Sequence, residues 1–135
     1  IKAQHGLALL WDAHSIRSEV PRFFEGRLPD LNLGSAEGAA AAGSLMDILA
    51  AVARDAEHLG YTHAVNGRFK GGYITRRHGD PAQGVHAVQL ELSEITYMDE
   101  NPPFAFREDL AAKIRPVLSG LLHTLLAWAE MEQQG

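Results

Sequence analysis

The residues best placed for chemistry lie directly after a short apolar run near the start of the chain. Leu7 to Trp11 is apolar and of strand length, and Asp12 and His14 follow it at once. A buried parallel strand that ends in this way delivers polar side chains to the rim of a sheet, where a histidine can bind a metal ion or act as a base. A purely structural histidine is an equally open interpretation of this position.

Asp12 lies two residues before His14, so both side chains point to the same face of an extended strand. The carboxylate of Asp12 can therefore accept a hydrogen bond from the imidazole and hold it in place. A salt bridge from Asp12 to Arg17 or Arg76 is the alternative.

The second candidate is Glu91, near the end of the clearest alternating stretch, Val85 to Leu92. One face of this predicted strand begins with Val85 and Ala87 and becomes polar toward Glu91. A carboxylate at the polar end of a half-buried strand is typical of a general base that activates water. A solvated side chain is the alternative, which the apolar start of the same face makes the weaker interpretation.

A glycine-rich, cationic loop from Asn66 to Arg76 supplies candidates for binding an anion. Its glycines allow the backbone to approach a ligand, and Arg68, Lys70 and Arg76 can bind carboxylates. The order of residues is not that of a Walker loop, and a solvated basic loop is the alternative. The other six histidines show no metal-ligand spacing, and we expect each to be structural or at the surface.

These side chains need a sheet whose strand ends meet. We expect a first strand covered on both faces, and the order strand, helix, strand predicts a parallel crossover. The loops are expected to include a turn at Asp30 to Ser35. The predicted strands cover residues 7–11, 61–65 and 85–92, with a short one at 73–75.

Two helices are predicted from apolar periodicity. The first begins with a capping box of Ser44 and Asp47 and ends at Gly60. The second covers residues 108–131, and Pro116 inside it should kink the helix or divide it in two.

The composition is that of one globular domain. The 135 residues are 46% apolar, and a net charge of −5 gives no reason to expect nucleic acid. Because the chain has no cysteine, any metal must be held by His, Asp or Glu, and a cytoplasmic location is compatible with this. The apolar stretches look too short or too interrupted to cross a membrane. The chain opens on Ile1 rather than Met, as if cut from something longer.

Four blocks taken together resemble the N-formylglutamate amidohydrolase family, also called the N-formylglutamate deformylase family. They occur in the family's order and extend from Trp11 to Glu100. The blocks are Trp11 to Ser18, Leu28 to Gly34, Asn66 to Arg76, and Gly84 to Leu92 with Tyr97 to Glu100.

The resemblance implies an α/β fold with a mixed sheet flanked by helices, similar to the zinc carboxypeptidases (phosphorylase/hydrolase-like). His14 would then be a zinc ligand, and Glu91 the base that takes a proton from zinc-bound water. The implied reaction is the hydrolysis of a linear amide, N-formyl-L-glutamate, to formate and L-glutamate in histidine degradation. The implied candidates for binding the substrate carboxylates are Arg68, Lys70 and Arg76, followed by Arg17 and Asn32.

The family's other two zinc ligands lie in an N-terminal half that this sequence lacks. We therefore expect residues 1–135 to be the C-terminal portion of a single α/β hydrolase domain. With an incomplete ligand set, the chain alone should be weakly metallated and inactive, and its truncated sheet should self-associate.

Two other functions remain open. The first is a zinc hydrolase of another N-acyl amino acid or short peptide. The second is a non-catalytic domain that binds a small dicarboxylate or a partner subunit. The leading hypothesis has a small-molecule substrate and involves neither nucleic acid nor a membrane.

Overall fold

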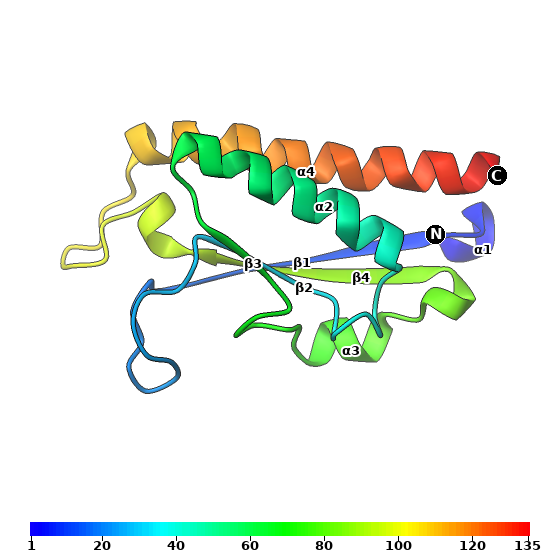
Figure 1. Ribbon diagram of the computed structural model, residues 1–135, viewed down its shortest axis with the longest axis horizontal. Helices are drawn as coiled ribbons and strands as arrows, with labels where there is room; N and C mark the ends of the chain where they lie inside the picture. Colours follow the sequence, from blue (N-terminus) through cyan, green and yellow to red (C-terminus); the bar gives the residue numbers. More distant parts are fainter.

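Four strands form one mixed sheet in the computed structural model, which describes residues 1–135. The order across the sheet is β1 (Ala8–Ile16), β4 (Val85–Ser93), β2 (Leu31–Gly34) and β3 (His63–Val65). β1 is parallel to β4 and β2 is parallel to β3, whereas β2 and β4 are antiparallel. The expected mixed sheet flanked by helices is therefore present (Figure 1).

The helices cover the two faces of the sheet unequally (Figure 1). α2 (Gly43–Asp55) and α4 (Glu108–Gln134) lie side by side over one face, and the short α3 (Tyr73–His78) lies on the other. α1 (Lys2–His5) precedes β1. Three 3-10 turns complete the set, namely η1 (Ala56–Leu59), η2 (Pro81–Gln83) and η3 (Glu94–Thr96).

The core lies between the sheet and the helix pair α2 and α4. We call this side of the sheet the helical face and the opposite side the polar face. Apolar side chains of alternate strand residues meet those of both helices there, and burying one such side chain is worth about 1.5–3 kcal/mol. The core residues are Leu31, Leu33, Ala41, Leu45, Met46, Leu49, Ala53, Ala56, Val88, Leu90, Leu92, Ile114, Val117, Leu121, Leu125 and Trp128.

β2 corrects the expectation of a turn at Asp30 to Ser35. Residues 31–34 are fully buried and pair with β4 on one side and β3 on the other. Asn and Gly favour turns, but here Leu31 and Leu33 alternate with them and enter the core. The parallel crossover therefore runs from β2 through α2 to β3, and β1 takes no part in it.

β1 also differs from the expected strand. It continues to Ile16, so His14 lies inside the strand rather than after it. It lies at the edge of the sheet and is partly exposed, not covered on both faces. An edge position tolerates polar residues, which explains how pairing with β4 continues through Asp12 and His14.

Two local predictions about helices were wrong. Residues 73–75 begin the helix α3 and are not a strand. α2 begins after Ala42 without a side-chain cap, so Ser44 does not start a capping box. The Ser44 hydroxyl instead accepts a hydrogen bond from the indole N–H of Trp128 at 3.1 Å, which ties the start of α2 to α4.

α4 is one uninterrupted helix, so Pro116 does not divide it. Pro116 is exposed, as is Ala112, whose carbonyl loses its helical partner and can be hydrated instead. By length and composition alone α4 is also apolar enough to cross a membrane, contrary to the expectation. Core helices of soluble proteins share that property, and α4 packs its buried side against α2.

Candidate functional site

Strand pairing brings three of the predicted site residues into one row. His14 on β1 is the direct partner of Glu91 on β4, and Asn32 on β2 is the partner of Glu91 from the other side. Paired residues in neighbouring strands project to the same face, so all three belong to the polar face. The adjacent row contains Asp12 and Gln89, which are also direct partners.

His14 is held by Asp12. The Nε2 atom of His14 lies 2.8 Å from Oδ1 of Asp12, and the histidine side chain is 46% exposed. Because a carboxylate only accepts, Nε2 is the donor of this hydrogen bond, and in the neutral imidazole Nδ1 then keeps a free lone pair. The alternative salt bridge from Asp12 to Arg17 or Arg76 is not formed. The arrangement leaves one nitrogen of His14 able to bind a ligand.

Glu91 is buried beside this pair, with 7% of its surface exposed. Burial raises the pKa of the Glu91 carboxyl, and the charges of Asp12 and Glu94 raise it further, whereas His14 lowers it. A carboxyl with a raised pKa holds a proton more tightly than an ordinary carboxyl does, which favours its use as a general base.

Asn32 forms part of the floor of the site. Its Nδ2 donates to the carbonyl oxygens of Pro29 at 2.7 Å and Glu91 at 3.1 Å, and its Oδ1 is buried without a partner. The side chain is only 2% exposed. The contact with Glu91 joins β2 to β4, and a substrate contact of Asn32 stays a prediction.

Three of the four predicted cations are already engaged with protein groups. Arg68 Nη2 donates to the Phe23 carbonyl at 2.5 Å, and Arg76 Nη1 donates to the Gly71 carbonyl at 2.7 Å. Lys70 Nζ lies 2.6 Å from Oε1 of Glu37. Arg68 and Lys70 keep further donors, because each cation has more than one N–H. The exposed Arg17 forms no ion pair.

Arg68 and Lys70 line a hollow of about 470 Å³ on the polar face, which we call the cationic hollow. Its other lining residues are Ile16, Phe23, Phe69, Gly71, Gly72 and Gln89. Ile16 and Gln89 are two residues from His14 and Glu91 on their strands, so the hollow adjoins the row of site residues. Neither Arg17 nor Arg76 lines it.

Gln89 was not predicted as a site residue. It is 6% exposed, and its Oε1 accepts the backbone N–H of Gly72 at 2.6 Å. Its Nε2 has no protein partner and remains available in the cationic hollow. The signal was present in the sequence, because Gln89 precedes Glu91 by two residues on the same face of the strand.

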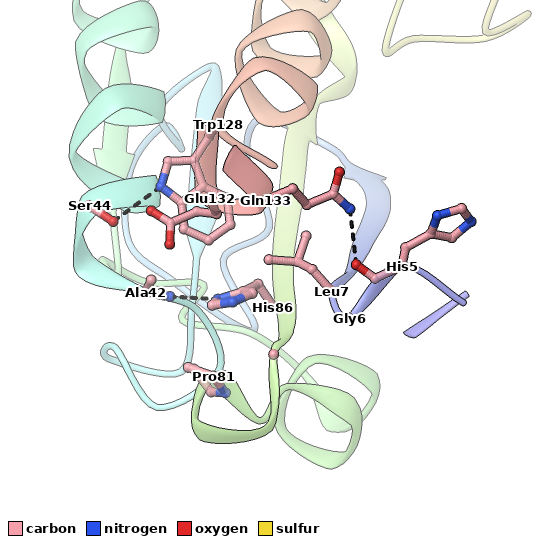
Figure 2. A pocket seen from close by; sticks show the side chains of 11 residues that line it. His5, Gly6, Leu7, Ala42, Ser44, Pro81, His86, Trp128, Glu132 and Gln133 are labelled. Carbon is pink, nitrogen blue, oxygen red and sulfur yellow. Dashed lines mark hydrogen bonds between the residues drawn. The ribbon is translucent and has the colours of Figure 1, made fainter. Parts of the chain in front are cut away.

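A larger hollow, of about 650 Å³, lies at the other end of the sheet (Figure 2). Its buried residue His86 accepts the backbone N–H of Ala42 on Nδ1 at 3.1 Å and packs edge-on against Trp128, with ring centroids 4.8 Å apart. Burial lowers the pKa of His86. These contacts fit the structural role expected for His86.

The family assignment follows from the sequence match. Residues 1–98 match the family model described as N-formylglutamate amidohydrolase. This chain belongs to the N-formylglutamate amidohydrolase family.

Relatives with this name are similar along nearly the whole chain. An N-formylglutamate deformylase of Pseudomonas aeruginosa is 60% identical over 128 residues, which are 95% of this chain and 47% of the relative. One of Pseudomonas putida is 54% identical over 134 residues, covering 99% of this chain and 49% of the relative. The chain thus spans about half the length of these relatives.

A solved structure is also similar along nearly the whole chain. The crystal structure of N-formylglutamate amidohydrolase from Ralstonia eutropha JMP134 has a TM-score of 0.77 and 25% sequence identity. The similarity covers 99% of this chain and 48% of that one. The crystallised chain therefore has about twice as many residues as this chain.

The residues of this chain do not make a complete metal site. No group of three or more His, Cys, Asp or Glu side chains is close enough to hold an ion. His14, held by Asp12, fits a single ligand position, whereas a catalytic zinc site uses three protein ligands.

Proposed function

We propose that this chain carries half of the active site of an N-formylglutamate deformylase, a cytoplasmic enzyme of histidine degradation. The observation that carries the proposal is the direct pairing of His14 with Glu91 beside the cationic hollow. The names of the relatives support the same activity. The chain would be the C-terminal portion of one zinc-carboxypeptidase-like α/β domain.

Glu91 is the residue we assign to proton transfer. In the hydrolysis, a water oxygen attacks the formyl carbon and the carbon–nitrogen bond breaks. Glu91 takes a proton from the attacking water and passes it to the departing nitrogen of glutamate. The raised pKa of its buried carboxyl suits both transfers.

A zinc ion bound at this site would polarise the formyl oxygen and lower the pKa of the attacking water. In this chain Nδ1 of His14 would be one ligand, and Asp12 would fix the ring through Nε2.

The cationic hollow is the proposed binding place for the substrate carboxylates. Arg68 and Lys70 bring two positive charges to it, and N-formylglutamate carries two carboxylates. Gln89 offers a free amide N–H group on the floor of the hollow. Arg17 and Arg76 lie outside its lining and are the weaker candidates.

Formate release by a chimera tests the substrate. In the chimera, residues 1–135 replace the matched stretch of the Pseudomonas aeruginosa relative, so that the rest of the relative completes the site. We expect higher kcat/KM for N-formylglutamate than for N-formylaspartate or N-acetylglutamate. Preference for either analogue would indicate another N-acyl substrate and contradict the proposal.

A further inference from the structure

We propose that a neutral α-amino acid binds in the hollow beside His86, at the opposite end of the sheet from His14 and Glu91. This hollow lies between the start of α2, the end of α4 and the start of β4, and we call it the His86 hollow (Figure 2). The inference goes beyond the proposed function and does not depend on it.

A buried hydrogen-bond donor lines the His86 hollow. His86 is only 6% exposed, and its Nδ1 accepts the backbone N–H of Ala42 at 3.1 Å. In the neutral ring the proton is therefore on Nε2, which has no partner in the protein. Burial lowers the pKa of His86 and outweighs the charge of Glu132, which raises it, so the neutral ring is favoured. A ligand that accepts from Nε2 would satisfy this donor.

The start of α2 adds further donors to the same hollow, which it lines through Ala42 and Ser44. The helix has no side-chain cap, and the backbone N–H groups of residues 43–45 make no hydrogen bond within the protein. The Ser44 hydroxyl accepts the indole N–H of Trp128 at 3.1 Å, so its own proton can be donated to a ligand. Donors at the start of a helix favour a carboxylate.

The His86 hollow also contains a carboxylate that is not neutralised. Glu132 lines it from the last turns of α4, and its side chain forms no ion pair. Figure 2 shows this carboxylate pointing toward Ser44, whereas the ring of His5 points away from it. The ligand should therefore carry a positive charge close to its carboxylate. An α-amino acid has an ammonium and a carboxylate on one carbon atom and supplies both charges.

Other small ligands match these groups less well. A simple anion near α2 would be repelled by Glu132, and a simple amine would leave the donors of His86 and Ser44 without an acceptor. A metal ion lacks the three ligands it needs. Leu7 and the ring of Trp128 also line the hollow, whose volume is about 650 Å³, so an apolar side chain fits there. A neutral amino acid with an apolar side chain is therefore the ligand class we infer.

Nuclear magnetic resonance titration of ¹⁵N-labelled residues 1–135 with L-leucine tests the site. We expect saturable shifts of the Ser44 amide signal and the Trp128 indole N–H signal at concentrations up to about 10 mM. The chain has two tryptophans, and Trp11 on β1 lies outside the His86 hollow. The indole signal of Trp11 should therefore stay in place and serves as an internal control.

Two matched ligands separate the two charges of the amino acid. 4-Methylpentanoate is L-leucine without its ammonium group, and 3-methylbutylamine is L-leucine without its carboxylate. Each should bind about tenfold more weakly than L-leucine, because each leaves one set of protein groups without a partner. Binding of 4-methylpentanoate as tight as that of L-leucine would indicate an anion site, and equally tight binding of 3-methylbutylamine would indicate a cation site. Either result would overturn the proposal.

Two variants probe the protein side of the same contacts. Glu132→Gln should weaken L-leucine about tenfold and should not weaken 4-methylpentanoate, because it removes a repulsive charge. Ser44→Ala should weaken both ligands. Glu130→Gln is the matched control, because Glu130 is an exposed residue of the same helix outside the hollow. Circular dichroism of each variant checks that it folds.

The proposal is overturned if L-leucine causes no saturable shift at Trp128, or if it shifts Trp11 equally. It is also overturned if Glu132→Gln binds L-leucine as tightly as Glu130→Gln does. The titration needs neither zinc nor N-formylglutamate. Failure of the amino acid site therefore leaves the proposed deformylase function intact, and failure of that function leaves the amino acid site intact.

Discussion

Glu91 is an ionisable residue in a buried position, and burial disfavours its ionisation. The side chain lies in the middle of the row His14, Glu91 and Asn32, and almost none of it contacts solvent. Burial favours the protonated carboxyl, and only the nearby imidazole of His14 favours the ionised one. The residue therefore weakens the fold at neutral pH, which is typical of a group retained for chemistry.

The pH dependence of stability follows from this environment. A carboxyl whose folded pKa is raised contributes its full stability below the unfolded value, near 4.5, and loses it as pH rises through the folded pKa. Glu91→Gln should therefore make residues 1–135 more stable at pH 7 and have little effect at pH 4. Urea denaturation at both pH values measures this, with the exposed Glu130→Gln as control. Equal effects at both pH values would contradict it.

Replacing Glu91 or His14 in the chimera should change zinc binding and turnover in different ways. Glu91→Gln removes the proton acceptor, so kcat should fall about 10²- to 10⁴-fold while bound zinc is unchanged. His14→Ala removes the proposed zinc ligand, so both zinc and turnover should be lost. Metal analysis and formate release separate these outcomes, with the exposed His58→Ala as control. Near-normal turnover of Glu91→Gln would show that another residue is the base.

Asp12, His14 and Glu91 could be selected from the sequence because alternation assigns them to one face of a strand. The direct pairing of His14 with Glu91 could not be predicted, since the register between strands so far apart in the chain depends on tertiary packing. The hydrogen-bond partners of Arg68 and Lys70 also could not be predicted from the sequence. The Phe23 carbonyl and Glu37 belong to loops whose positions no local pattern specifies.

At the scale of elements, the close approach of β2 to the cationic loop shapes the binding hollow. A Cβ atom on Gly34 would lie 2.5 Å from the Lys70 carbonyl carbon and 2.7 Å from the Gly71 nitrogen. Asn66 completes this contact, because its Oδ1 accepts the backbone N–H of Ser35 at 2.9 Å. The loop that carries Arg68 and Lys70 is therefore positioned by the buried strand β2.

Gly34→Ala tests this positioning. The added methyl group must displace backbone, so we expect a loss of about 1–3 kcal/mol in the free energy of unfolding. Gly120→Ala is the matched control in α4, where the new methyl group would lie 3.6 Å from Val52 Cγ1 in ordinary contact. Higher helix propensity should make it stabilising by about 0.5–1 kcal/mol. Urea denaturation of both variants measures the difference, and equal effects would contradict the prediction.

The long periodic elements could be predicted, and the short ones could not. β4, α2 and α4 have enough residues for their apolar pattern to appear in the sequence. β2 has only four residues, two of them Asn32 and Gly34, so local preference indicated a turn. Pairing on both sides outweighs that preference.

At the scale of the molecule, the sheet is covered by helices on its helical face but is open at the edge formed by β1. The core between the sheet and the helices α2 and α4 is buried, whereas the outer edge of β1 is unpaired and the adjoining side of α4 is exposed. His14 lies on β1, at this open edge. This asymmetry supports the proposal that the chain carries only half of an active site.

Zinc retention should differ between residues 1–135 alone and the chimera. With His14 as its one fitting ligand, residues 1–135 should retain well under one zinc per molecule after dialysis. The chimera, in which the rest of the relative would complete the proposed ligand set, should retain one. Plasma emission spectrometry of both proteins measures the ratio. Stoichiometric zinc and deformylase turnover in residues 1–135 alone would contradict the expectation.

The nine consecutive residue pairs between β1 and β4, from Ala8 with Val85 to Ile16 with Ser93, also limit how such a chain can evolve. Inserting or deleting one residue inside β1 would rotate His14 to the helical face, away from Glu91, even if the strand still paired. Loops such as residues 17–30 can change length without this effect. Length variation within the family is therefore expected to spare these two strands and to accumulate in the loops between them.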